Sequence, residues 1–234
     1  MSCAHRIHEN PLGDEGITKL VSGMIALHGA TMPVAPDAMT DRPGKGNTIA
    51  SEPESGSDVT SGDYVASNNA VNGDAINQTS GKVNLLSLKS LEIGACGITA
   101  ASASAVADLI RANMGITALS VTGNKDIESH GWAEIAESLE NNSVINVLEL
   151  HHNALENTSA SLIADGLARN TSIRTVDLEG NHIGDEGADK ILKMLEVNRT
   201  LQTIYLRNGN GMSESVLADI ERLTEERQHL SSAT

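Results

Sequence analysis

Aromatic residues are almost absent from this chain of 234 residues, which holds no Phe, one Trp and two Tyr. A core without aromatic rings has to be filled by Leu, Ile, Val, Ala and Met, and such small side chains suit a thin, repetitive core. A large aromatic-lined ligand pocket is therefore not expected. Cysteine is also scarce, with only Cys3 and Cys96, which are far apart in the sequence, so no disulfide framework is predicted.

Basic residues are few, because 16 Lys and Arg stand against 31 Asp and Glu and give a formal net charge of −15. Residues 85–234 alone hold 21 acidic and 11 basic residues, so the acidity is not confined to one tail. A nucleic acid partner requires a positively charged face and is not expected here. A protein partner with a basic surface fits this charge, and plain solubility explains it equally well.

Enzyme motifs are missing as well: the sequence contains no H-E-x-x-H, G-x-S-x-G or C-x-x-C. Residues 44–46 read Gly-Lys-Gly but lack the strand–loop–helix setting of a phosphate-binding loop. We therefore expect neither catalysis nor a cofactor.

Long apolar runs are absent too, so no segment is expected to cross a membrane and no secretion signal is recognised. This favours a reducing, cytoplasmic location. The N-x-S/T pattern occurs five times, at Asn77, Asn141, Asn157, Asn170 and Asn198. Three of these, Asn141, Asn170 and Asn198, recur at the same turn of the repeat described next, so the repeat accounts for them better than glycosylation does.

One pattern, approximately L-x-x-L-x-L-x-x-N, occurs five times between Leu88 and Gly211. Its last position is separated by 28, 29, 28 and 28 residues in successive copies and falls at Cys96, Asn124, Asn153, Asn181 and Gly209. A fixed period in this range is typical of a leucine-rich repeat solenoid, an α/β fold that usually serves as a binding scaffold.

Each copy predicts one strand and one helix. Val176 and Leu178 alternate with polar residues, as in a strand, whereas Ile191 and Leu195 follow at helical spacing. Asp185 stands where a helix N-cap is expected. A polar helix with one apolar stripe is predicted over residues 213–229 as a C-terminal cap.

A sixth, partial copy is predicted at the N-terminus. Residues 13–16 repeat residues 184–187 letter for letter, and a stub of strand is expected around residues 6–8. The chain thus starts inside a repeat, which favours a fragment of a longer array over a frayed first unit.

We divide the chain into a partial repeat over residues 1–29, an insertion over residues 30–84 and a repeat array with its cap over residues 85–234. The insertion is rich in Pro, Gly, Ser, Asn and Asp, which predicts a disordered loop. The alternative is that it folds back and covers the exposed end of the stack.

A period of 28–29 residues with a helix in each unit resembles the ribonuclease-inhibitor-like subfamily of leucine-rich repeats, which includes repeat regions of NOD-like receptors, Ran GTPase-activating protein and tropomodulin. The resemblance covers residues 5–28 and 85–229. It implies a horseshoe with a parallel sheet on the concave face, helices on the convex face, and an intracellular protein-binding role. Cys96 fits the subfamily pattern, which accepts Asn or Cys, whereas Gly209 departs from it.

The strand residues that point away from the core predict the site. They lie four and two residues before the pattern position, where the middle copies are acidic. We predict a scaffold or adaptor that binds its partner on this concave face, although an ordinary solvated sheet face remains open as the alternative. The predicted contact residues are Glu92, Glu149, His151, Asp177, Glu179, Tyr205 and Arg207.

Three further hypotheses concern other residues. A regulator of a small GTPase is the alternative function by analogy with Ran GTPase-activating protein, but no residue here is assigned a role at the nucleotide. A metal site at His151, His152 and His182 is not expected, because their side chains should not converge. Trp132 is expected to pack on the adjoining turn, and a second contact patch is the alternative.

Overall fold

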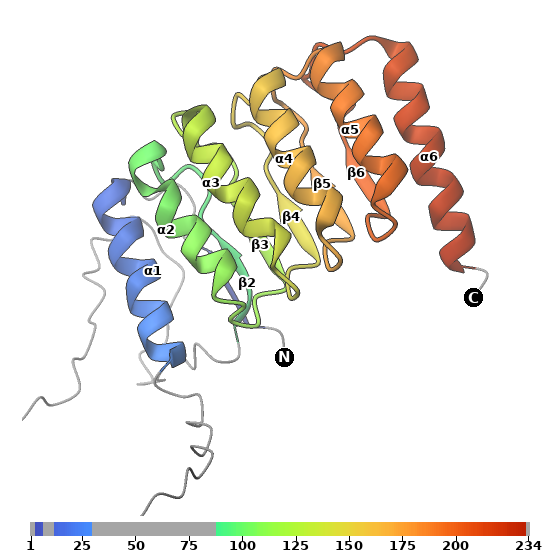
Figure 1. Cartoon of the computed structure of the whole chain (residues 1–234). Helices are drawn as coiled ribbons and strands as arrows, with labels where there is room; N and C mark the ends of the chain where they lie inside the picture. The colour runs from blue at the N-terminus through green and yellow to red at the C-terminus, as the bar shows by residue number, and fades with distance from the viewer. Residues whose placement is uncertain (1–2, 7–11, 30–87, 233–234) are drawn as a thin grey trace, which may run out of the picture. The chain divides into compact units, whose positions relative to one another are not determined.

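The computed structural model describes residues 3–6, 12–29 and 88–232, which form six strands and six helices in strict alternation (Figure 1). The strands are β1 (Cys3–Arg6), β2 (Leu88–Glu92), β3 (Ala118–Ser120), β4 (Val147–Glu149), β5 (Thr175–Asp177) and β6 (Thr203–Tyr205). The helices are α1 (Gly13–Gly29), α2 (Ala100–Arg111), α3 (Glu128–Glu140), α4 (Asn157–Arg169), α5 (Asp185–Val197) and α6 (Glu214–Ser232). The predicted insertion lies outside the described residues.

The six strands form one parallel sheet in chain order, and each helix packs beside the next in a second layer (Figure 1). The prediction of one strand and one helix per repeat is confirmed, and the fold is an α/β leucine-rich repeat solenoid. The first strand is β1 at residues 3–6 rather than the stub expected around 6–8. Its Arg6 pairs with Glu92 of β2, so the partial first copy joins the sheet.

The core lies between the two layers and is filled by equivalent positions of successive repeats. On the strands, Leu119, Leu148 and Val176 are buried and paired in register. On the helices, Leu139, Leu167 and Leu195 are likewise buried. Trp132 is only 2% exposed, which confirms the packing interpretation and rules out the alternative of a contact patch.

Buried asparagines connect the turns after the strands, and we call Asn124, Asn153, Asn181 and Asn210 the asparagine ladder. The Oδ1 atom of Asn124 accepts the N–H groups of Cys96 at 3.0 Å and Ile98 at 3.2 Å in the preceding repeat. Its Nδ2 donates to the Val121 carbonyl of its own repeat at 3.1 Å and to the Ile93 carbonyl of the preceding repeat at 3.0 Å. Each amide therefore satisfies backbone groups of two repeats that would otherwise be buried without partners.

The last member of the ladder is Asn210, so the prediction that placed this position at Gly209 is wrong by one residue. Asn210 donates to the carbonyls of Leu178 at 2.9 Å and Leu206 at 3.0 Å, and it accepts the N–H of Ile183 at 3.0 Å. The extra residue lies between Tyr205 and Gly209, because Gly209 corresponds to Gly180, which likewise has a positive φ directly before a ladder asparagine.

A second row of asparagines, Asn142, Asn170 and Asn198, lies at the turns from helix to strand. Asn170 donates to the Leu139 carbonyl at 2.7 Å and accepts the N–H of Ile173 at 2.7 Å. The first member is Asn142 rather than Asn141, the position predicted from the N-x-S/T pattern. Asn170 and Asn198 are 2% and 4% exposed, so the fold explains these two sequons and leaves their amides inaccessible to glycosylation.

The N-terminus of a helix is capped from the neighbouring repeat in three places. Asp185 does not cap its own helix as predicted; its Oδ1 accepts the Ser213 N–H before α6 at 2.6 Å. Asn157 in the same way accepts the Gly184 N–H before α5 at 2.8 Å. The acidic or amide side chain in the first turn of one helix thus satisfies the orphan donors of the next.

Asp14 makes the corresponding link between α1 and α2. It accepts the Thr99 N–H at 2.9 Å and the Ser102 hydroxyl at 2.5 Å. The hydrogen bonds from Ser102 and Thr99 hold the pKa of Asp14 below its ordinary value of 3.8. Because the pKa is lowered on folding, this link stabilises the protein above pH 3.8 and is lost as the pH falls through the lowered pKa.

Replacing Asp14 by Ala is therefore expected to loosen α1 by about 1 kcal/mol, as for the loss of a helix cap. Amide exchange measured at neutral pH should accelerate along α1 and leave α4 and α5 unchanged. Glu15→Ala is the control, because Glu15 only pairs with the exposed Lys19. Unchanged exchange in α1 of the Asp14 variant would contradict this assignment.

The C-terminal helix α6 buries Leu217 and Ile220 against the last repeat, as its predicted apolar stripe requires. Arg227 on α6 donates to the carbonyls of Leu195 near the end of α5 and of Leu201 before β6. Burial and the nearby charge of Arg199 lower the pKa of Arg227. Within the described ranges, none of the helices combines the length and the apolar character that a membrane span requires.

Candidate interaction surface

The predicted contact residues lie on the face of the sheet that is turned away from the helices, which we call the open sheet face. Its central row runs across five strands through residues paired in register. The predicted acidic residues lie in this row, but β3 contributes a serine instead of an acidic residue. In order from β2 to β6, the row is Glu92, Ser120, Glu149, Asp177 and Tyr205.

The acidic part of the open sheet face is concentrated on β4 and β5. Glu149 and Asp177 are half-buried neighbours in register, about 4.8 Å apart across the sheet as in any strand pair. Like charges placed directly opposite on neighbouring strands destabilise a sheet. This pair is therefore a place where an added positive charge is favourable.

His151 lies beside this pair of carboxylates. Its Nδ1 atom lies 3.3 Å from Oδ2 of Asp177, so a protonated ring would form an ion pair there. The same Nδ1 is buried and has no hydrogen-bond partner among the described residues. Asp177 also accepts the Glu179 N–H at 2.9 Å, which fixes its carboxylate on the face.

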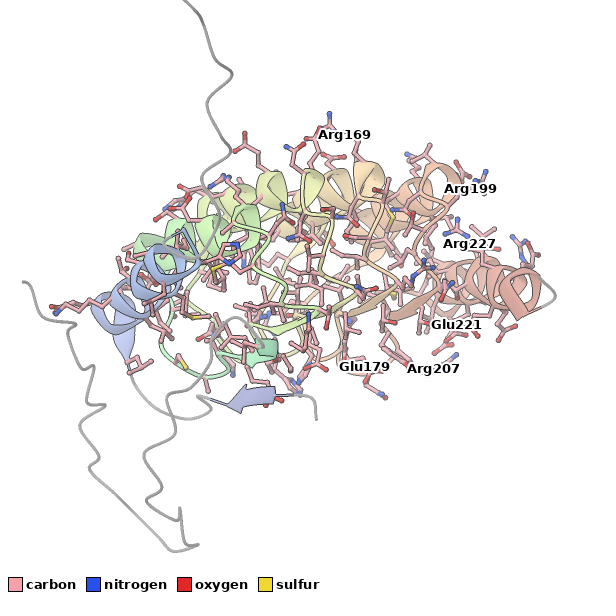
Figure 2. All side chains as sticks on the ribbon, turned by 90° about the horizontal axis from the view of Figure 1, so that it is seen from below. Arg169, Glu179, Arg199, Arg207, Glu221 and Arg227 are labelled. Carbon is pink, nitrogen blue, oxygen red and sulfur yellow. The ribbon has the colours of Figure 1, made fainter. Side chains whose placement is uncertain are left out.

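The C-terminal end of the face is closed by an ion pair that the sequence did not indicate. Arg207 donates to both carboxylate oxygens of Glu221 on α6, at 2.8 and 2.7 Å (Figure 2). Glu214 lies 3.7 Å from the same guanidinium. The hydrogen bonds and charge of Glu221, followed by the charge of Glu214, raise the pKa of Arg207. Arg207 is therefore already engaged within the chain.

The other predicted residues at this end differ in availability. Glu179 accepts the side-chain amide of Asn208 at 2.7 Å. Tyr205 is 50% exposed and stands alone among the described residues as a large aromatic side chain at the surface. At the opposite side, Ser120 at the end of β3 and Thr122 just after it are buried and hydrogen-bonded to each other at 2.8 Å, so the acidic part of the face does not extend continuously to Glu92.

The part of the chain that the structure describes contains no cluster of three His, Cys, Asp or Glu side chains suited to a metal ion. The rings of His151 and His152 meet edge to face with centroids 5.4 Å apart, which is a packing contact. His182, the third residue considered, joins no such cluster.

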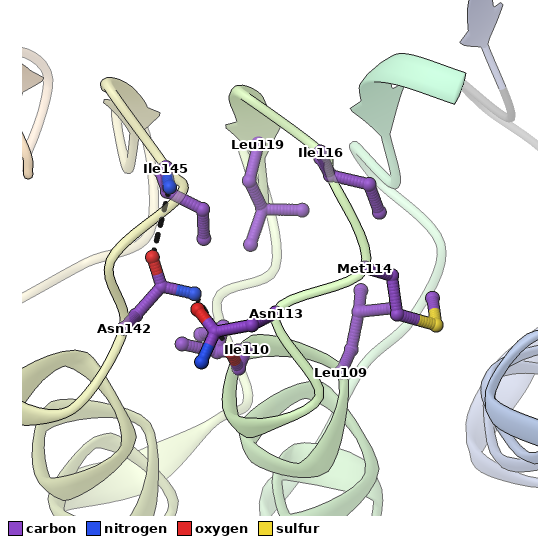
Figure 3. A pocket seen from close by; sticks show the side chains of 8 residues that line it. All are labelled: Leu109, Ile110, Asn113, Met114, Ile116, Leu119, Asn142 and Ile145. Atoms are coloured by element: carbon purple, nitrogen blue, oxygen red, sulfur yellow. Dashed lines mark hydrogen bonds between the residues drawn. The ribbon is translucent and has the colours of Figure 1, made fainter. Parts of the chain in front are cut away.

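The interior between α2 and the next repeat holds a void of about 10 Å³, lined in part by Leu109, Met114 and Asn142 (Figure 3). Such a volume is at the lower limit for one water molecule. The Oδ1 atom of Asn142 accepts the Ile145 N–H at 2.8 Å beside it (Figure 3). This void is a packing defect and not a ligand site.

The chain was compared with known families, curated proteins and solved structures. The family described as "Leucine Rich repeat" matches residues 169–192, and the comparison with curated proteins gave no match. Among solved structures, the chain is similar to actin-binding site 2 of leiomodin-1, with a TM-score of 0.47 and 19% identity over 54% of this chain and 90% of that one. It is also similar to the tropomodulin C-terminal domain of Caenorhabditis elegans, with a TM-score of 0.41 and 11% identity over 56% of this chain and 96% of that one.

The strand and helix in each repeat of 28 or 29 residues and the asparagine ladder give the chain a leucine-rich repeat fold, and the family match falls on one of these repeats.

Proposed function

We propose that this chain is a non-catalytic interaction module that binds a protein with a basic surface through the acidic part of the open sheet face. Glu149, Asp177 and Glu179 supply the negative charge, His151 lies among them, and Tyr205 supplies an exposed aromatic contact. The observation that carries the proposal is the register pair of Glu149 and Asp177, whose mutual repulsion a partner's Lys or Arg would relieve.

Two of the predicted contact residues contribute less to binding in this proposal. Arg207 is held by Glu221 and Glu214, so it shapes the end of the face rather than offering a free charge. Glu92 lies beyond the buried Ser120 and contributes at most to the field around the partner. The alternative of a GTPase regulator gains no specific support, because it needs an arginine that can reach a nucleotide. We also propose a reducing, cytoplasmic location, which suits a chain whose two cysteines lie far apart in the sequence.

Reversing the charge of Glu149, Asp177 and Glu179 to Lys is expected to reduce capture of the partner about tenfold or more, because the basic surface would then meet like charge. The full chain should be immobilised and the captured protein quantified at low and at high salt. Capture by the unmodified protein should weaken as salt rises, since exposed charges are screened.

A matched reversal on the helical side controls for net charge. Glu186, Asp189 and Glu196 on α5 are exposed carboxylates, and changing them to Lys alters the net charge equally. This control should capture the partner as the unmodified protein does, and both variants should keep the circular dichroism spectrum. Equal losses in the two variants would show that net charge, and not the open sheet face, governs binding.

A further inference from the structure

The last strand leaves a backbone donor without a partner. In earlier repeats, the residue directly after the strand donates its N–H to the next strand: Leu150 to the Asp177 carbonyl at 2.8 Å, and Leu178 to the Tyr205 carbonyl at 2.9 Å. Leu206 is the equivalent residue after β6, and its N–H meets no acceptor among the described residues. In a parallel strand, the N–H and C=O groups of alternate residues point to opposite neighbouring strands. The N–H and C=O of Ile204 therefore point to the same side as the Leu206 N–H, which is the edge of β6 away from β5.

These groups border a cleft of about 190 Å³ between β6 and α6. Ile204 and Leu206 form its strand wall, and Leu217 and Ile220 form its helix wall, so the interior is apolar. The cleft also reaches Tyr205 at the surface, next to the ion pair of Arg207 and Glu221.

The remainder of the β6 edge is closed by side chains of this chain. Arg227 donates to the Leu201 carbonyl at 3.1 Å, and Gln228 donates to the Gln202 carbonyl at 3.3 Å. At the other end, Asn210 donates to the Leu206 carbonyl at 3.0 Å. The unpaired edge is thus confined to the stretch from Ile204 to the Leu206 N–H, which is the stretch that the cleft exposes.

The charges around the cleft favour a cation. Glu179 and Glu221 line it, Glu214 lies nearby, and Arg207 alone stands against these three carboxylates. Arg207 binds Glu221 in bidentate fashion, but its single positive charge does not balance the three carboxylates. A basic side chain from outside is therefore attracted to this rim and can share its carboxylates with Arg207.

We propose that the cleft accepts an extended segment of a partner protein, which adds to β6 as a short seventh strand. Its backbone would pair with Ile204 and Leu206, an apolar side chain would enter between the strand wall and the helix wall, and an adjacent Lys or Arg would pair with Glu221. Strand addition of this kind gains affinity from main-chain hydrogen bonds and specificity from the side-chain pocket. The site does not depend on the carboxylates of β4 and β5.

Phage-displayed random dodecapeptides selected on the full chain provide the probe, and the enriched peptides are then synthesised with a fluorescent label. We expect enrichment of sequences with an apolar residue beside Lys or Arg. Binding of these peptides should slow the amide exchange of Leu206 to a rate like that of Leu178. A peptide held by charge alone would leave the Leu206 amide unchanged.

Two variants test the pocket and its rim separately. Leu217→Phe should fill the cleft and Glu221→Gln should remove the cation partner, each weakening peptide binding about tenfold. Val197→Phe at the exposed end of α5 and Glu225→Gln on α6 are the matched controls and should bind as the unmodified chain does. Melting temperatures establish that all four variants fold.

Several outcomes would overturn the strand-addition site: no enrichment of peptides, unchanged Leu206 exchange in the complex, or binding that survives both Leu217→Phe and Glu221→Gln. Loss of peptide binding when only Glu149 and Asp177 are reversed to Lys, with Glu179 at the cleft left in place, would move the peptide to the open sheet face. A dimer that sediments as such and dissociates in Leu217→Phe would assign the cleft to a second copy of the chain.

Discussion

Replacing Asn181 by Ala is expected to lower the free energy of unfolding by about 3 kcal/mol, because two buried backbone N–H groups lose their side-chain acceptor and two carbonyls each lose one of two side-chain donors. Its Oδ1 accepts the N–H groups of Asn153 at 2.9 Å and Leu155 at 3.1 Å. Its Nδ2 donates to the carbonyls of Leu178 at 2.8 Å and Leu150 at 3.1 Å. Chemical denaturation followed by circular dichroism measures the loss.

Asn208→Ala is the control for the Asn181 variant. Its side-chain amide contacts only the exposed Glu179 carboxylate, so the change should cost less than about 1 kcal/mol. Similar losses for Asn181→Ala and Asn208→Ala would show that the asparagine ladder does not hold the repeats together.

Replacing Gly166 by Ala is the second change with a large expected effect. A Cβ on Gly166 would clash with the carbonyl group of Ala136 and lie only 2.9 Å from the carbonyl carbon, so α4 and α3 would have to separate. Helix propensity favours Ala over Gly by about 1 kcal/mol, but a forced shift of two packed helices costs more. We expect a net loss of about 2 kcal/mol in the free energy of unfolding, measured by urea titration.

Gly23→Ala is the control that measures the effect of helix propensity without a change in packing. A Cβ on Gly23 in α1 would meet nothing within 4 Å, so only the helix propensity changes. This variant should therefore gain up to about 1 kcal/mol. A stabilised Gly166→Ala variant would mean that the helices can separate without loss of packing.

The repeat could be predicted from the sequence because its signal is local. Apolar residues at period two before the pattern position and at helical spacing after it dictate a strand and then a helix, as Val176 and Ile191 illustrate. The fixed repeat period predicted the wrong residue where a turn contains one extra residue. The constant spacing pointed to Gly209, whereas the hydrogen bonds select Asn210, because Asn210 lies five residues after Tyr205 while Asn181 lies four residues after its register partner Asp177.

Contacts between repeats could not be predicted in the same way. Asp185 carries the sequence signal of an N-cap, yet it serves the next helix, because the side chain in the first turn reaches the neighbouring turn. The ion pair of Arg207 with Glu221 joins residues 14 positions apart and depends on how α6 packs on β6. The open sheet face, in contrast, follows from strand alternation alone, and its register confirms the predicted arrangement of Glu149, Asp177 and Tyr205.

The most direct measurement of the proposed binding face is site-specific photo-cross-linking. A photoreactive amino acid is placed at Glu149 on the open sheet face or, as the control, at the exposed Asp189 on the helical side, and each full-length variant is irradiated in cell extract. The proposal predicts a discrete, salt-sensitive protein adduct from position 149 and none from position 189. An adduct formed from position 189 alone, or no adduct from position 149, would contradict it.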